Sequence, residues 1–87
     1  MAVVKGRLAD ESNRPVPSGT VYFISGPVAL PDIAQLTGTD GEFVLSVPVP
    51  GRYRIGARAP GFTSSEADVD VSSAEARIKL TLKRANA

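Results

Sequence analysis

Apolar and polar residues alternate in short segments along almost the whole of this 87-residue chain, and turn-forming residues separate the segments. The clearest example is the segment 76–83, in which Ile78, Leu80 and Leu82 alternate with polar or charged residues. A period of two places successive side chains on opposite faces of a β-strand, so the pattern predicts strands with one buried face. Seven strands are predicted, at residues 3–8, 20–25, 34–37, 42–47, 52–59, 66–71 and 76–83. Short strands at this spacing predict an all-β fold, a seven-stranded antiparallel β-sandwich.

The alternation also gives each predicted strand an inward and an outward face. The predicted core consists of Val4, Leu8, Val21, Phe23, Phe43, Leu45, Tyr53, Ile55, Val69, Ile78, Leu80 and Leu82. On the fifth and sixth predicted strands the outward residues carry opposite charges, so we expect cross-strand ion pairs there. These residues are Arg52, Arg54 and Arg58 on one strand and Glu66, Asp68 and Asp70 on the other. The length suits one modest core, and we expect a single domain over residues 1–87.

The chain contains neither cysteine nor histidine. This excludes thiolate nucleophiles, disulfides, cysteine–histidine zinc sites and imidazole general bases, so we expect no catalytic residues, no cofactor and no enzyme activity. Asp10, Glu11 and Asp40 lie in loops expected at one end of the sandwich, where three carboxylates could hold Ca²⁺. We favour the alternative that Asp10 and Asp40 are turn residues bonded to their own backbone, and expect no metal. No loop has the dense acidic spacing of a calcium site.

Several short motifs follow one another in the order and spacing of a known family. They are Val4-x-Gly6-x-Leu8-x-Asp10, Arg14-Pro15-Val16-Pro17 before Val21-Tyr22-Phe23, Thr39-Asp40-Gly41-x-Phe43, Pro50-Gly51-x-Tyr53 and Ala59-Pro60-Gly61-Phe62. Over most of its length the chain therefore resembles carboxypeptidase regulatory-like domains. The resemblance implies a Greek-key β-sandwich of transthyretin-like type, in which these motifs supply turns and core.

Some relatives with this type of fold carry out chemistry, and the chain lacks the residues that they need. The transthyretin-like hydrolases use histidines, and none is present. Collagen-adhesin B-type domains often form a lysine–asparagine crosslink promoted by a glutamate, whose place by spacing falls near Ala57. Lys5 is suitably early in the chain for such a crosslink, but alanine cannot transfer a proton. The resemblance therefore implies a non-catalytic domain.

The resemblance also implies that the first and last strands are neighbours in one sheet. Their outward residues would form a basic face of Lys5, Arg7, Arg77, Lys79 and Lys83, with Glu42 as the only acid expected on it. The net charge of the whole chain is only +1, so these cations would give one side of the domain a local excess of positive charge. This excess predicts a patch for an acidic partner, such as an anionic polysaccharide, an acidic domain or a membrane surface. The alternative is that the cations maintain solubility and discourage edge pairing.

Two apolar loops are expected at the end opposite Asp10 and Asp40. Residues 26–31 contain Val28 and Leu30, and residues 48–50 contain Val49. These loops predict a tip that docks a partner. The alternative is that Val28 and Leu30 fold back and cap the core.

We expect a non-catalytic structural or interaction module, an accessory or spacer domain of a larger protein. The alternative is a domain that binds a carbohydrate or acidic ligand, although at least three of the five aromatics, Tyr22, Phe23, Phe43, Tyr53 and Phe62, face the core. A protein or polysaccharide partner fits these functions, whereas the net charge gives no reason to expect nucleic acid.

We expect a monomer. We also expect no transmembrane segment, because no apolar run approaches about 20 residues. The location stays open: extracellular or cell-envelope for part of a longer secreted protein, otherwise cytoplasmic.

Overall fold

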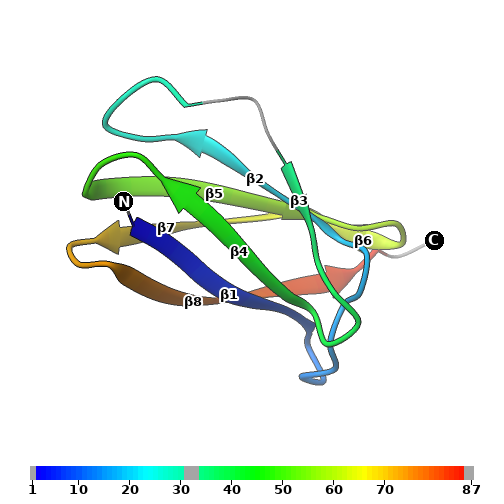
Figure 1. Ribbon diagram of the computed structural model, residues 1–87. Coiled ribbons are helices and arrows are strands. Elements are labelled where there is room, and N and C mark those ends of the chain that lie inside the picture. Colours follow the sequence, from blue (N-terminus) through cyan, green and yellow to red (C-terminus); the bar gives the residue numbers. More distant parts are fainter. Residues whose placement is uncertain (1, 31–33, 86–87) are drawn as a thin grey trace.

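The computed structural model describes residues 2–30 and 34–85, which form two four-stranded sheets (Figure 1). Sheet A contains, in spatial order, β4 (Glu42–Val47), β1 (Ala2–Asp10), β8 (Glu75–Arg84) and β6 (Phe62–Thr63). Sheet B contains, in spatial order, β3 (Ala34–Leu36), β2 (Thr20–Ser25), β5 (Gly51–Arg58) and β7 (Ser65–Val71). The predicted all-β fold is confirmed for these residues, and the two sheets are consistent with a β-sandwich.

The described residues form eight strands, so the prediction of seven was wrong. The additional strand, β6, comprises only Phe62 and Thr63, which pair with Arg84 and Lys83 at the end of β8. Two residues are too few for an alternating pattern to be recognised. The other seven strands lie where the alternation placed them, with some ends shifted by one or two residues.

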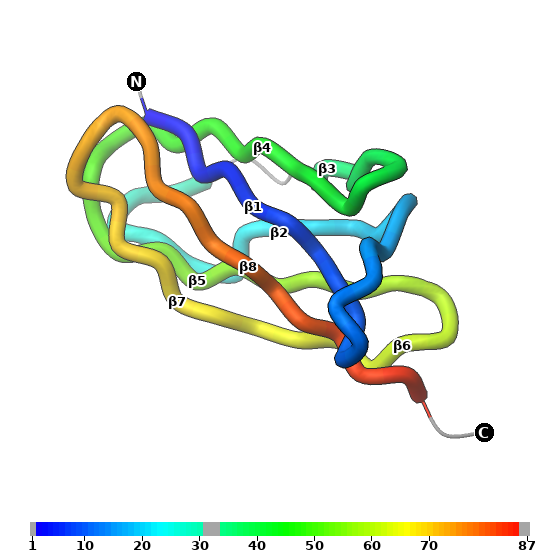
Figure 2. The backbone as a smooth tube through the Cα atoms, turned by 90° about the horizontal axis from the view of Figure 1, so that it is seen from below, coloured from blue at the N-terminus to red at the C-terminus, as the bar shows by residue number. Residues whose placement is uncertain are grey.

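β1 and β8 run parallel, which corrects the prediction of a purely antiparallel sandwich. Val3–Asp10 pair in register with Glu75–Leu82. The chain crosses from sheet B to sheet A between β7 and β8, and it enters β8 at the end of the molecule where β1 begins (Figure 2). The two strands therefore lie side by side and run in the same direction. The expected place of the first and last strands in one sheet is confirmed, while the Greek-key order stays a prediction.

The core lies between the inward faces of the two sheets. Its largest fully buried side chains are Tyr53, Leu8, Ile55, Leu82, Val4, Val21, Val47 and Val71. Ten of the twelve residues predicted for the core are buried, whereas Phe23 and Ile78 are only partly buried and pack against it. Phe23 adjoins an irregularity in the pairing of β2 with β5. Ile78 lies on β8 ahead of the residues that pair with β6, and its side chain is only partly buried.

The Asp40–Gly41 turn takes the chain from β3 in sheet B to β4 in sheet A. Gly41 has a φ of +79°, a conformation that favours glycine, and an added Cβ would lie 2.3 Å from the carbonyl oxygen of Leu8. The Gly41 carbonyl in turn accepts a hydrogen bond of 2.8 Å from the Leu8 N–H. This contact fixes the start of β4 against β1, so the loops that carry Asp10 and Asp40 lie at the same end of the molecule.

Candidate functional site

Parallel pairing of β1 with β8 brings cations together on the outward surface of sheet A. Lys5 pairs in register with Arg77, and Arg7 pairs with Lys79. Lys83 lies farther along β8, beside Thr63 of β6. We call the surface formed by Lys5, Arg7, Arg77, Lys79 and Lys83 the basic face. Neighbouring strands are about 4.8 Å apart, so like charges on β1 and β8 lie close together across the ladder.

Glu75 is a second acid on the basic face, which the sequence analysis missed. Its carboxylate lies 3.3 Å from Lys5 Nζ and 2.8 Å from Arg77 Nε. Hydrogen bonding to Lys5 is the main reason that the pKa of Glu75 is lowered from its usual value, and the charge of Arg77 lowers it further. Glu75 lies two residues before Arg77, just as Arg77 lies two residues before Lys79. This spacing could have placed Glu75 on the same face.

Glu42, the acid expected on this face, interacts with its neighbour Asp40. A hydrogen bond between the two side chains raises the pKa of Glu42 and lowers that of Asp40, and the charge of Asp40 adds to the effect on Glu42. Arg7 Nε donates to the backbone carbonyl of Asp40 at 3.3 Å. Arg7 thus anchors the turn before β4.

The cations of the basic face differ in how strongly they are compensated. Lys79 donates a hydrogen bond to Asn13 Oδ1, a neutral partner. Within the described residues, the ion pairs of this face involve Lys5 and Arg77, and none involves Arg7, Lys79 or Lys83. Arg77 nevertheless keeps 77% of its side chain exposed. A surface groove is lined by Lys5, Arg7 and Arg77 together with Glu42 and Val44.

The predicted docking loops do meet at the opposite end of the molecule. An added Cβ on Gly51, which follows residues 48–50, would lie 2.7 Å from Pro27, so the two loops are in contact. Leu30 is partly buried against the core, as the capping alternative predicted, whereas Val28 is 43% exposed. Val49 is partly buried, and its carbonyl accepts a 2.6 Å hydrogen bond from the Tyr53 hydroxyl. Pro31 lies outside the described residues, and docking at these loops stays a prediction.

Asp10 and Asp40, two of the acids that could hold Ca²⁺, make turn contacts. Asp10 Oδ1 accepts hydrogen bonds of 2.9 Å from the N–H groups of Ser12 and Arg14. The bond from Arg14 is the main cause that lowers the pKa of Asp10. Asp40 Oδ1 accepts from the Glu42 N–H at 3.3 Å, so both residues bond their own backbone, as predicted. In the part of the chain that the structure describes, no three acidic side chains cluster closely enough to hold a metal ion.

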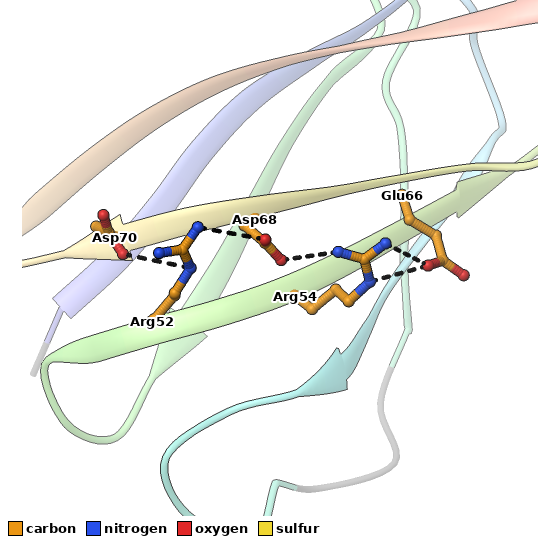
Figure 3. Close-up of polar contacts among 5 residues, drawn as sticks. All are labelled: Arg52, Arg54, Glu66, Asp68 and Asp70. Carbon is orange, nitrogen blue, oxygen red and sulfur yellow. Dashed lines mark hydrogen bonds and ion pairs between the residues drawn. The ribbon is translucent and has the colours of Figure 1, made fainter.

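The outward surface of sheet B carries a ladder of ion pairs between β5 and β7 (Figure 3). The measured contacts are Arg52–Asp68 at 3.4 Å, Arg52–Asp70 at 4.0 Å, Arg54–Glu66 at 2.9 Å and Arg54–Asp68 at 3.0 Å. Cross-strand pairing is therefore confirmed for Arg52 and Arg54. Arg58 instead places its guanidinium 5.4 Å from the centre of the Tyr22 ring. Sheet B thus neutralises its own charges, whereas the basic face keeps an excess of cations.

Comparison with known proteins gives one family. The sequence profile of the carboxypeptidase regulatory-like domain matches residues 3–83, a range that runs from β1 almost to the end of β8. A comparison with curated proteins found no match. Nothing in residues 2–30 and 34–85 forms a helix long and apolar enough to cross a membrane.

Proposed function

The chain belongs to the carboxypeptidase regulatory-like domain family, and from this premise we propose that it is an accessory interaction module whose basic face binds an acidic polymer. Domains of this family are non-catalytic modules, which suggests a regulatory or interaction role. The partner that we propose is a linear polyanion such as an anionic polysaccharide.

The observation that carries this proposal is the row of outward cations on β8. Alternate residues of a strand are about 6.6 Å apart, so Arg77, Lys79 and Lys83 span roughly 20 Å along one line. Lys5 and Arg7 on β1 form a shorter parallel row beside them. Thr81 interrupts the row between Lys79 and Lys83, but two neighbouring rows of cations still suit a partner with repeated negative charges. Attraction between exposed charges falls as salt rises.

The aromatic residues favour a charged ligand over a neutral sugar. Phe43 and Tyr53 are buried. Arg84 lies 5.0 Å from the centre of the Phe62 ring, and Arg58 covers Tyr22 in the same way. A flat aromatic surface for stacking a sugar ring would require these arginines to move.

Heparin chromatography tests the proposal, with a double variant on the basic face as the probe. Arg77→Gln with Lys79→Gln removes two positive charges from the face and leaves the Lys5–Glu75 ion pair in place. We expect wild type to elute at a clearly higher salt concentration than this variant. A sulfated polymer resin and a simple cation exchanger should rank the proteins in the same order.

The matched control is Arg52→Gln with Arg58→Gln, which changes the net charge equally but lies on sheet B. We expect the control to elute close to wild type, because its basic face is intact. If both double variants elute together, only the net charge matters and the proposed site is wrong. Circular dichroism of all three proteins is the check that they are equally folded.

A further inference from the structure

The two strands at the ends of the described chain are neighbours, yet they start and finish at opposite ends of the molecule. β1 begins at one end of the 39 Å long axis, and β8 finishes at the other (Figure 1). Between these points the strands run parallel through eight paired residues, Val3–Asp10 with Glu75–Leu82. Any tension applied to the flanking chain at both ends therefore passes from β1 to β8 across their shared ladder.

The direction of this tension loads the ladder in shear. β1 would be pulled backward from its first residue and β8 forward from its last, so the two strands could separate only by sliding past each other. A slide of one residue, about 3.3 Å, breaks the register of all the paired residues together. A ladder that is pulled open from one end breaks its pairs one after another, and each broken pair needs less force.

Neighbouring elements oppose the same slide. β4 pairs with the other edge of β1, from Ala2–Val47 to Arg7–Glu42, so sliding β1 out of the sheet would shear this pairing as well. Behind the ladder, Leu8 and Leu80 are paired in register and are buried at 0% and 2% exposure. Sliding would move these side chains out of their packing positions, where interiors are close-packed and tolerate little displacement.

We propose that this domain has a mechanical function: it resists tension applied at its two ends, through shear of the β1–β8 ladder. This function goes beyond binding to an acidic polymer and does not use the charges of the basic face. Forced unfolding is governed by the rate of crossing the unfolding barrier rather than by equilibrium stability. A domain of modest stability can therefore still resist force in this one direction.

Single-molecule pulling in two directions on the same protein tests the proposal. In the first geometry the handles are attached at the two ends of the chain. In the second they are attached at the N-terminal end and at a cysteine introduced by Ser72→Cys, an exposed residue between β7 and β8. Because the chain has no cysteine of its own, attachment is unique. The second geometry pulls β1 away from the start of β8 and opens the ladder pair by pair.

We expect a clearly higher unfolding force in the first geometry than in the second at the same pulling speed. Unfolding through the ends should occur in one step of about 250–270 Å, which is 87 residues at 3.3–3.6 Å each less the 39 Å folded length. Equal forces in both geometries, or a lower force through the ends, would overturn the proposal.

The variant Arg77→Gln with Lys79→Gln separates this proposal from the binding function. We expect its unfolding force through the ends to match wild type, because the backbone ladder and the buried leucines are unchanged. A large fall in force would contradict shear of the ladder as the origin of resistance and assign it to side-chain charges instead. Loss of heparin binding with unchanged force leaves the mechanical proposal standing.

Discussion

Arg54 on β5 and Asp68 on β7 lie directly opposite each other, and their charged atoms are 3.0 Å apart. Arg54 also reaches Glu66, so one guanidinium joins two acids of the neighbouring strand. Two of the three arginines on β5, Arg52 and Arg54, are thus paired with the three acids of β7, so the charges on this surface of sheet B are compensated locally. The net positive charge of the molecule is consequently concentrated on sheet A.

The ladder predicts a loss of stability in acid. Hydrogen bonding to Arg54 lowers the pKa of Asp68 below its ordinary value of 3.8. A depressed pKa in the folded state stabilises the fold above pH 3.8, and this contribution disappears as the pH falls from there through the folded-state pKa. We expect Asp68→Asn to lower the melting temperature at pH 7 and to reduce its dependence on pH below 4, measured by circular dichroism.

Asp70→Asn is the control for this prediction. Its only ion-pair contact within the described residues is the 4.0 Å approach to Arg52, and its side chain is 75% exposed. We expect a smaller change in melting temperature from Asp70→Asn than from Asp68→Asn, because exposed ion pairs contribute little. The reverse order would show that the geometry of the ladder does not determine its contribution.

Leu80→Ala tests the assignment of faces on β8. Leu80 is 2% exposed, and its replacement should cost about 2–5 kcal/mol of unfolding free energy through lost burial and a residual cavity. Leu36→Ala is the matched substitution at a site that is 69% exposed, and it should change stability by no more than about 0.5 kcal/mol. Urea denaturation of both variants measures the two values. Similar midpoints for the two would mean that the inward face of β8 is assigned wrongly.

Gly41→Ala and Gly61→Ala separate steric collision from backbone conformation. The two glycines have almost the same φ, +79° and +81°. An added Cβ at Gly41 meets the Leu8 carbonyl oxygen at 2.3 Å, whereas nothing lies within 4 Å of one at Gly61. Both variants should be destabilised by at least about 1 kcal/mol, because the φ does not suit alanine. We expect a greater loss at Gly41, and equal losses in urea denaturation would count against a close contact between the Gly41 turn and β1.

The arrangement of strands could be predicted to the extent that it depends on alternation. The inward positions of β8 and β4 follow from a period of two. Phe43, Leu45, Leu80 and Leu82 are buried as expected, and Ile78 is partly buried. Other buried residues lie outside that pattern. Val16 is 3% exposed because its N–H bonds to the Leu8 carbonyl from a turn-rich segment. Thr37 is buried because its hydroxyl donates to the Val16 carbonyl and accepts from the Gly19 N–H, contacts between loops that no local pattern encodes.

The sequence predicted the cations of the candidate site and one of its acids, Glu42, but missed Glu75. Lys5, Arg7 and the three cations that β8 contributes to the basic face follow from outward positions and from the neighbouring first and last strands. Glu75 was missed because the predicted strand began at residue 76, whereas β8 begins at Glu75 itself. The parallel direction of β1 and β8 also depends on where the chain crosses between the sheets, which is a property of the whole topology.

Asp10 has a side chain that is only 6% exposed, and it anchors the loop after β1. Asp10→Ala removes the acceptor for the Ser12 and Arg14 N–H groups and the contact with Arg84, so it should lower the melting temperature clearly. Asp10→Asn keeps one carbonyl acceptor and should lie between Asp10→Ala and wild type. Glu11→Ala, at an exposed neighbouring position, should leave the melting temperature unchanged.

Melting temperatures measured with and without Ca²⁺ distinguish this turn function from a metal site at the same residues. A ligand that binds only the folded state raises the melting temperature as its concentration passes the dissociation constant. We expect millimolar Ca²⁺ to leave wild type and Asp10→Ala equally unaffected, because Asp10 Oδ1 already accepts two backbone hydrogen bonds. A calcium-dependent rise in wild type that Asp10→Ala abolishes would instead show that these carboxylates bind the ion.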